Sequence, residues 1–416
     1  FKKYNIDIKF NEKINYGLLP GPHFYSKNLS ILRDNKEIGN VKNLKVFFKL
    51  SQFFSINKIF IKNLVFDRTD FNIYSKDFVF FENLLKTEPH ENKIYFKKSN
   101  IFFKNKEEQV MFINKIDIGQ FYYDSNNLLN VFSTKNEIFN VPFKLIIKND
   151  KFNKEVSAKF KSKKIRLNLD TKLNYDNESS KSGLLDILSL NKNTSLNYVI
   201  KKNSLSFKSN DNRIYYKGIM DFKPFYLDVD FAYKGLNLKN LFNNKSIFLD
   251  LINSEILNNK NLNAVFNIKV EDITNISEFN NLDFKISIEQ GDIFFSNSTI
   301  MWKDDLKITL NESSLNVNDD GINLAGSIKL NFEDINNFYS SFQIPKKNRK
   351  DINNIEVDFI YNFNNKNVKL QNPIINNSRN LDLEEFLNNF NRKKVRTFNK
   401  ITFKNFINNF FGNYVG

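Results

Sequence analysis

The feature of this sequence that most constrains its fold is a hydrophobic pattern with a period of two residues. Between Ile165 and Tyr175 the odd positions are mostly large and apolar, and the even positions are polar or charged. Successive side chains of a β-strand point to opposite faces of its sheet, so this segment predicts a strand with one apolar and one wet face. The same alternation returns in segments 225–233, 266–270, 284–288, 322–332 and 355–363. Antiparallel sheets with one face in water have this pattern, whereas parallel sheets buried on both faces do not.

Helices are expected to be few. Only four segments have plausible short helical patterns, at residues 236–242, 248–257, 381–390 and 398–411. The chain has 416 residues, is 41% hydrophobic and contains 46 Phe, which is ample material for a buried core and argues against disorder. Strands with one apolar face must hide that face, either in a sandwich or barrel or along one sheet curled into a gutter. A gutter leaves part of its apolar lining open, which indicates a ligand or a membrane.

The residues that usually carry catalysis or metal binding are scarce. Without Cys there is no disulfide scaffold or thiolate metal site, and two histidines cannot build a multi-histidine site. His23 follows a Gly-Pro turn and His90 lies in a polar loop, neither near a Gly-x-Ser-x-Gly elbow. The pairs Asp304–Asp305 and Asp319–Asp320 are interpreted as hairpin turns rather than acid–base or metal pairs. We therefore expect no enzymatic activity, no cofactor and no metal.

The charge balance is strongly basic, with 62 Lys and Arg against 46 Asp and Glu, a formal charge of +16. The bias toward Asn, Lys, Ile and Phe is typical of AT-rich coding DNA, so codon usage competes with anionic partners as the explanation. Aromatic residues interleaved with Lys suggest single-stranded nucleic acid binding. Strict alternation separates the two types onto opposite faces, however, so no nucleic acid partner is expected.

The sequence has no run of about 18 apolar residues, which is what a membrane-spanning helix requires. The chain begins at Phe1 rather than Met, so we expect that an N-terminal segment is missing.

Two groups of segments carry a family resemblance. Residues 28–34, 38–50 and 58–66, after the Pro-containing entry at 19–22, resemble the N-terminal part of AsmA-family proteins. A second group resembles the C-terminal repeat region of the same family and comprises residues 235–241, 293–303 and 324–330. The resemblance spans about residues 1 to 375, and its motifs are diffuse patterns rather than invariant signatures.

The resemblance implies a mostly β fold, in which a long twisted antiparallel sheet curls into a taco-like groove with an apolar interior and few short helices. It also implies a bridge-like lipid-transfer protein of the bacterial inner membrane, facing the periplasm and carrying phospholipid toward the outer membrane. Such proteins are tethered by an N-terminal helix, so we expect this protein to contact the membrane through a helix in the missing N-terminal segment. A second function remains open: an assembly or scaffolding factor for outer-membrane proteins, whose sheet edge captures unfolded strands and which has envelope protein partners.

The alternating apolar positions are the candidate lipid contacts. They are Ile165, Leu167, Leu169, Leu173, Leu227, Val229, Phe231, Phe266, Ile268, Val270, Phe284, Ile286, Ile288, Leu324, Ile328, Leu330, Val357 and Phe359. The competing interpretation is that these residues pack on each other as an ordinary sandwich core. The predicted organisation is an N-terminal groove part at 1–160, its continuation at 161–380, and a helical segment at 381–416.

The last segment contains an apolar stripe at helical spacing. Its members are Phe403, Phe406, Ile407, Phe410 and Phe411. A cluster of basic residues at 392–404 lies on its N-terminal side. Two interpretations remain open: a basic amphipathic helix lying in an anionic membrane interface, or a helix that caps the open end of the sheet.

Overall fold

A computed structural model describes most of the chain. The described residues are 6–49, 61–74, 92–105, 107–175, 181–189, 192–201, 204–210, 214–222, 225–237, 260–318, 321–392 and 400–414. Strands make up 68% of these residues, so the protein is mostly β, as the alternation predicts. The described residues fall into two compact units: unit 1 ends at residue 201, and unit 2 begins at residue 204.

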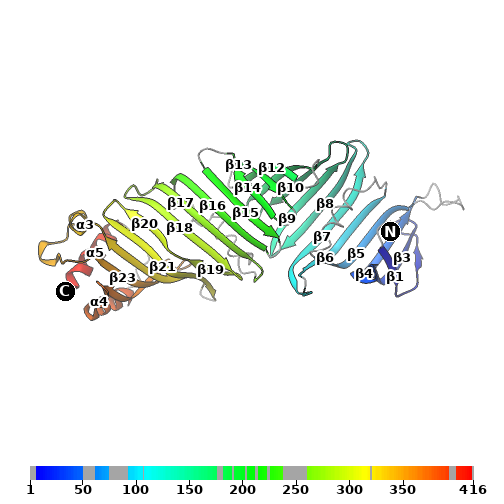
Figure 1. The fold of residues 1–416 in the computed structure, drawn as a ribbon. Helices are drawn as coiled ribbons and strands as arrows, with labels where there is room; N and C mark the ends of the chain where they lie inside the picture. Colours follow the sequence, from blue (N-terminus) through cyan, green and yellow to red (C-terminus); the bar gives the residue numbers. More distant parts are fainter. Residues whose placement is uncertain are drawn as a thin grey trace. The chain divides into compact units, whose positions relative to one another are not determined.

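The secondary-structure elements of unit 1 that lie in the described residues are all strands (Figure 1). They are β1 (Ile6–Phe10), β2 (Asn15–Gly17), β3 (His23–Arg33), β4 (Lys36–Phe48), β5 (Ile61–Tyr74), β6 (Lys93–Lys104), β7 (Val110–Asp124), β8 (Leu129–Ile138), β9 (Val141–Asp150), β10 (Glu155–Ser162), β11 (Leu167–Asn174), β12 (Lys181–Ser189) and β13 (Lys192–Ile200). Both β1 and β2 pair with β3, and from β3 to β13 each strand pairs with the next along the chain.

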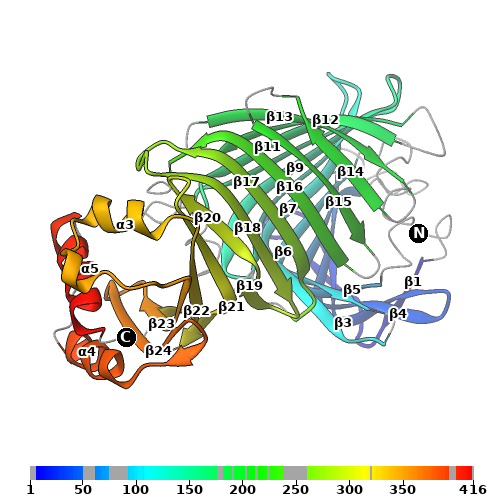
Figure 2. The same cartoon turned by 60° about the vertical axis from the view of Figure 1, so that its left-hand side comes forward.

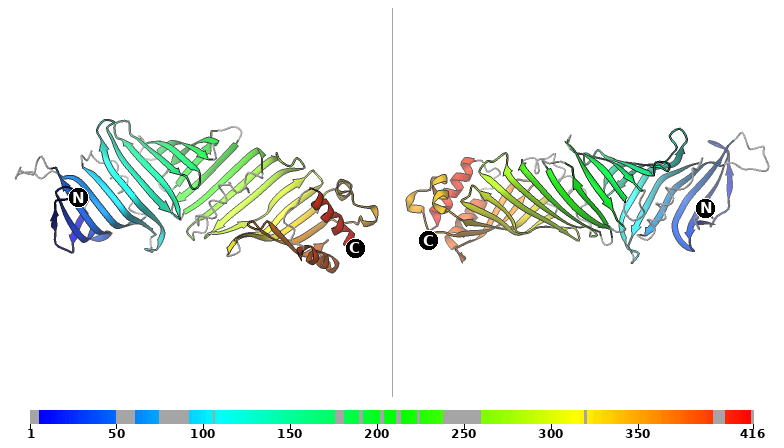
Figure 3. Two further views of the ribbon diagram at one scale, coloured as in Figure 1. Left: turned by 180° about the vertical axis from the view of Figure 1, so that it is seen from behind. Right: turned by 45° about the horizontal axis from the view of Figure 1, so that its top comes forward.

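Unit 2 combines strands with short helices. Its strands are β14 (Ser204–Ser209), β15 (Ile214–Phe222), β16 (Phe225–Leu236), β17 (Asn263–Ile273), β18 (Phe279–Glu289), β19 (Asp292–Phe295), β20 (Ser298–Trp302), β21 (Leu306–Asn318), β22 (Gly321–Phe332), β23 (Asn354–Asn362), β24 (Asn367–Ile375) and β25 (Ser378–Arg379). The helices are α3 (Ile335–Phe342), α4 (Leu381–Arg392) and α5 (Lys400–Asn413), with one 3₁₀ turn at Lys346–Asn348. Figure 3 shows the green and yellow strands of this unit side by side from two directions.

The sheet of each unit is mixed, so the prediction of a purely antiparallel sheet is wrong. In unit 1, β5 and β6 are parallel, and in unit 2, β16 and β17 are parallel. Two consecutive strands can pair in parallel only if a connection of a dozen residues or more joins them. Residues 75–92 connect β5 to β6, and residues 237–262 connect β16 to β17. The period-two pattern does not distinguish the two pairings, because both place alternate side chains on opposite faces.

The described helices agree only partly with those predicted from the sequence. The segments 381–390 and 398–411 were predicted, and α4 and α5 confirm them. The predicted helices at 236–242 and 248–257 lie almost wholly outside the described residues. Helix α3 was not predicted from the sequence. Its N-cap residue is Asp334, whose side chain accepts a hydrogen bond from the backbone N–H of Asn337.

A large hydrophobic core of unit 2 lies where these helices meet the sheet. Figure 2 shows α3, α4 and α5 grouped beside β23 and β24. The core contains Trp302 and Leu306 from the sheet with Tyr339, Leu383 and Phe411 from the helices. A smaller core in unit 1 gathers buried residues of β3, β4 and β5, including Leu29, Val41 and Phe66.

The predicted division between residues 160 and 161 falls inside strand β10, whereas compact unit 1 continues to residue 201 in the described chain. The predicted C-terminal segment from 381 on contains α4 and α5, but both pack within unit 2.

Candidate functional site

An unbroken apolar row crosses the sheet of unit 2. Directly opposed residues of neighbouring strands share a face, so the register identifies its members. The row runs from β14 through β19 and on through β21 to β24: Leu205, Met220, Leu227, Ala264, Ile288, Ile293, Leu315, Leu324, Tyr361 and Val368. At about 4.8 Å per strand, nine steps give a length of roughly 43 Å.

Parallel rows on the same face bring together the unit 2 residues that the alternation singled out. In β16, β17 and β18, opposed triples are Val229–Phe266–Ile286, Phe231–Ile268–Phe284 and Tyr233–Val270–Leu282. Between β22 and β23, Ile328 opposes Val357, and Phe359 opposes Gly326. One face of the unit 2 sheet is therefore apolar over most of its described strands.

Unit 1 carries a row of the same kind. It crosses β4 to β13 through Val46, Leu64, Ile94, Phe121, Phe132, Ile147, Ala158, Thr171, Leu185 and Leu196. Thr171 is its single polar member, and its hydroxyl is satisfied locally by the carbonyl of Leu184 at 2.9 Å and the Tyr198 hydroxyl at 2.7 Å. The predicted residues Leu167, Leu169 and Leu173 lie on this face in β11.

Ile165 departs from the prediction. It is buried, but it lies in the turn between β10 and β11, and the strand begins two residues later at Leu167. The intervening Arg166 has a φ of 51°, in the left-handed region, which ends the strand alternation there.

The side chains of both rows are either buried or half-buried, and none is exposed. In unit 2, Ala264 and Ile288 are buried, whereas Leu227 and Leu324 remain partly accessible. The apolar side chains therefore pack on one another, but part of their surface remains accessible to solvent.

Burial makes this face a poor environment for charge. It raises the pKa of Tyr198 in unit 1 and of Tyr233 and Tyr361 in unit 2 above the ordinary value, because the phenolate would lose its hydration. All three hydroxyl groups are therefore neutral near pH 7.

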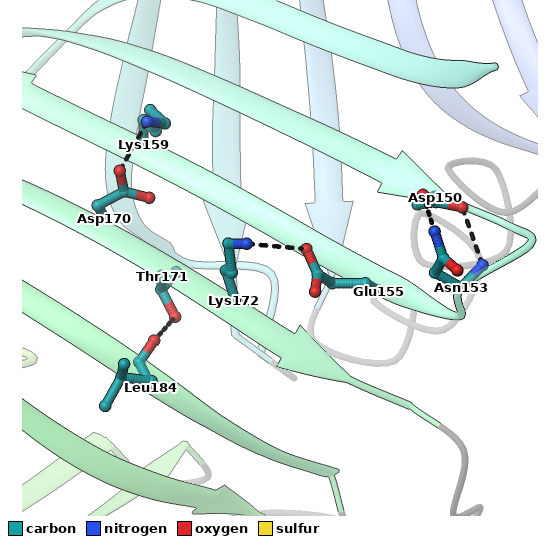
Figure 4. A network of polar contacts seen from close by, with 8 residues as sticks. All are labelled: Asp150, Asn153, Glu155, Lys159, Asp170, Thr171, Lys172 and Leu184. Carbon is teal, nitrogen blue, oxygen red and sulfur yellow. Dashed lines mark hydrogen bonds and ion pairs between the residues drawn. The ribbon is translucent and has the colours of Figure 1, made fainter. Parts of the chain in front are cut away.

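Charged residues instead lie on the opposite face, as cross-strand pairs. In unit 1, the Lys159 ammonium lies 2.7 Å from the Asp170 carboxylate, and Lys172 lies 3.7 Å from Glu155 (Figure 4). Further pairs join Lys115 with Glu137, Lys217 with Asp230, and Lys269 with Asp283. Such exposed pairs stabilise the fold little, but they keep this face hydrated.

The helices of unit 2 cover one part of its apolar face. Leu330 and Val357, both predicted lipid contacts, pack against the core that contains Phe338, Tyr339 and Phe411. Their neighbours Ile355 and Ile375 are almost fully buried in the same core. At these positions the structure places protein, not an open lining, over the sheet.

The apolar stripe of α5 faces the same core. Ile407, Phe410 and Phe411 are buried there, and Phe406 packs against them partly buried. Phe403 alone is exposed. The helix is also held by Asn408, whose side-chain amide donates to the carbonyl of Phe342 at 3.0 Å. Most of the stripe therefore contacts protein within unit 2.

The histidines and aspartate pairs considered as catalytic or metal-binding candidates lie, where the structure describes them, in a buried aromatic contact or a hairpin turn. His23 is buried against the Phe47 ring, and its Nδ1 donates to the carbonyl of Gly21 at 2.7 Å. Asp304 and Asp305 lie in the hairpin turn between β20 and β21, as expected, and Asp305 accepts a bond from Asn337 of α3. His90, Asp319 and Asp320 lie outside the described residues. Among the described residues, no cluster of potential metal ligands occurs.

Sequence reasoning missed the row of unit 1 before residue 165 because bulges invert the alternation there. Val41 and Leu44 are both buried although they are three residues apart, as are Phe66 and Thr69. Asn28, Arg68 and Lys98 all have positive φ in this part of the sheet. Such residues re-aim the following side chains, so a strict period-two search fails.

No protein-family model matches this chain, and a search of curated proteins finds no match. No described helix is long and apolar enough to cross a membrane.

Proposed function

We propose that this protein is a non-enzymatic lipid-binding protein of the bacterial envelope, and that it carries phospholipid between the inner and outer membranes. The observation that supports this most directly is the pair of apolar rows, each crossing ten strands with at most one polar member. The acyl chain lies along these rows, and the hydrated opposite face contacts solvent.

The energetics of an acyl chain support a continuous row. Exposing a chain of about 16 carbons to water costs roughly 12 kcal/mol, at about 0.8 kcal/mol per CH₂. A carrier must offset most of this along the whole path. Each row, at roughly 43 Å, is longer than the ~30 Å hydrocarbon core of a bilayer, so it can hold a full acyl chain.

The proposed location is the inner membrane, facing the periplasm, in the groove architecture of the AsmA-like family. The support for this is the resemblance of residues 28–66 and 235–330 to that family. In this proposal the neutral tyrosines of the apolar face leave the path free of fixed charge, so a lipid moves along it without strong local minima.

Native mass spectrometry of the purified chain, with lipid extraction, tests the proposal. We expect co-purified phospholipid. A photo-crosslinker at Ile268, on the apolar face, should capture lipid, and one at the adjacent Lys269, on the hydrated face, should not. A lipid-free protein, or equal capture at both positions, would contradict the proposal.

The assembly-factor alternative is favoured by one observation. In the described residues β1 pairs with β3 along one of its edges, and its other edge can offer backbone groups to an added strand. Hydrogen exchange at Ile6–Phe10 in the presence of extended outer-membrane peptides distinguishes the two functions. Strong new protection with no bound lipid would favour assembly.

A further inference from the structure

The turn between β2 and β3 exposes an unusual amount of apolar surface. Leu18 is 66% exposed and Leu19 is 87% exposed, and Ile14 just before β2 is also exposed. Tyr16 and Phe24, which oppose each other at the base of the turn, are exposed as well. We call these five residues the apolar tip. Exposed apolar clusters of this kind mark surfaces that contact a partner or a membrane.

The tip is well anchored despite its exposure. The Tyr16 and Phe24 rings lie 5.7 Å apart, and the Phe24 ring lies 4.9 Å from that of Phe48 in β4. The backbone N–H of Phe48 donates to the carbonyl of Pro22 at 3.1 Å, which ties the turn to β4. The turn that carries the two exposed leucines is therefore fixed to the sheet at its base.

Positive charge flanks the tip. Lys13 precedes β2, Lys27 lies in β3 and Lys49 follows β4, and all three are exposed. Within residues 11–28 and 45–49 the one acid is Glu12, whose carboxylate accepts a hydrogen bond from the Asn28 side chain at 2.6 Å. The local balance is thus basic and complements an anionic surface.

We propose that the apolar tip docks this protein onto the surface of an anionic phospholipid bilayer. Leu18 and Leu19 enter the boundary between headgroups and acyl chains, Tyr16 and Phe24 lie at the interface, and the lysines contact the phosphates. A projecting turn with a few large apolar side chains offers little area for a protein interface, but it can be buried completely in a lipid interface. This inference does not depend on the proposed lipid transfer.

Flotation of the full chain tests the proposal, with vesicles of phosphatidylcholine containing phosphatidylglycerol and with vesicles of phosphatidylcholine alone. We expect binding to the anionic vesicles, weakened about tenfold or more by the double substitution Leu18→Ser and Leu19→Ser. The matched control is Leu381→Ser, because Leu381 of α4 is 72% exposed but lies outside the tip. It should float like the wild type. Lys13→Glu with Lys27→Glu should remove the preference for anionic vesicles.

Absence of wild-type flotation would overturn the proposal, and so would flotation of the double variant at the wild-type level. A double variant that floats normally but changes its oligomeric state would instead assign the tip to a protein interface. Thermal melting verifies that the variant is folded, which we expect because the two leucines make little contact with the core. Lipid extraction from the same variant tests the carrier function separately, because the apolar rows are unchanged.

Discussion

The apolar face of unit 2 has two regions that arise from the same sequence pattern but have different environments. At one end of strands β21 to β24, helices α3, α4 and α5 cover it, and residues such as Ile355 and Ile375 are almost inaccessible. Over β14 to β18, residues such as Leu227, Phe231 and Phe266 are only partly buried in the described structure. Alternation therefore identifies an apolar face, but it does not distinguish a covered core from a ligand-accessible lining.

The difference matters for function because each region responds differently to mutation. Loss of a buried side chain leaves a cavity and costs stability, whereas a change in a partly open lining should mainly affect what binds there. Two predictions test this contrast directly, and two more concern contacts elsewhere in the fold.

The largest expected effect is in the covered region. Phe411→Ala should lower the free energy of unfolding by about 3–5 kcal/mol, because the ring is fully buried against Phe338 and Tyr339. The control is Phe403→Ala in the same helix, where the side chain is exposed and the loss should stay below about 1 kcal/mol. Denaturant titration measures both. Equal losses would show that the stripe of α5 does not pack into the core of unit 2.

A charge on the partly buried apolar face over β14 to β18 should affect lipid binding more than folding. Ile268→Lys places an ammonium group on the apolar face of β17 and should abolish co-purified lipid, because burying that charge beside an acyl chain is strongly unfavourable. Val265→Lys is the matched control, since Val265 lies in the same strand but opposes Asp228 on the hydrated face. Lipid extraction and melting compare the two. Retained lipid in the Ile268 variant would show that this face is an ordinary core.

An intermediate effect is expected where α4 protects the edge of β24. The Asn391 side chain accepts the backbone N–H of Leu370 at 3.0 Å and donates to its carbonyl at 2.7 Å, imitating a neighbouring strand. Asn391→Ala should cost about 1–2 kcal/mol for the two hydrogen bonds and increase aggregation. Asn388→Ala, at an exposed position of α4, is the control. Light scattering during storage and denaturant titration provide the measurements.

The smallest expected effect is that of pH on folding stability. The buried tyrosines make stability fall at high pH, whereas Asp150 makes it fall at low pH. Burial raises the pKa of Tyr198, Tyr233 and Tyr361, so they stabilise the fold below about pH 10 and this contribution is lost as the pH rises through their folded pKa values. Asn153 lowers the pKa of Asp150 through hydrogen bonds in the β9–β10 turn, so its contribution is present above pH 3.8 and is lost in acid. Stability measured against pH should fall at both extremes. In the Tyr233→Phe variant the alkaline fall should be smaller, and an unchanged fall would contradict this assignment.

The residues of the apolar face were easier to predict in unit 2 than in unit 1, because single left-handed residues interrupt the strand alternation in unit 1. In unit 2 the strands β16, β17 and β22 alternate regularly, so Val229, Phe266 and Leu324 could be placed on one face from spacing alone. In unit 1 the left-handed residues Arg68 and Lys98 invert the alternation inside β5 and β6. Nothing in the spacing of Phe66, Thr69 or Phe96 shows that inversion.

The sequence by itself determined that this protein is mostly β, with amphipathic strands and two helices near its C-terminus. These features depend on interactions between residues close in the chain, where periods of 2 and 3.6 residues appear directly in the spacing of apolar side chains. Only the tertiary structure decided that β5–β6 and β16–β17 are parallel, that Leu330 and Val357 pack against the core containing α3 and α5, and that Leu18 and Leu19 are left exposed. Strand partners and coverage depend on contacts between distant segments, and the local pattern of an apolar face is the same whether a helix, a lipid or water lies against it.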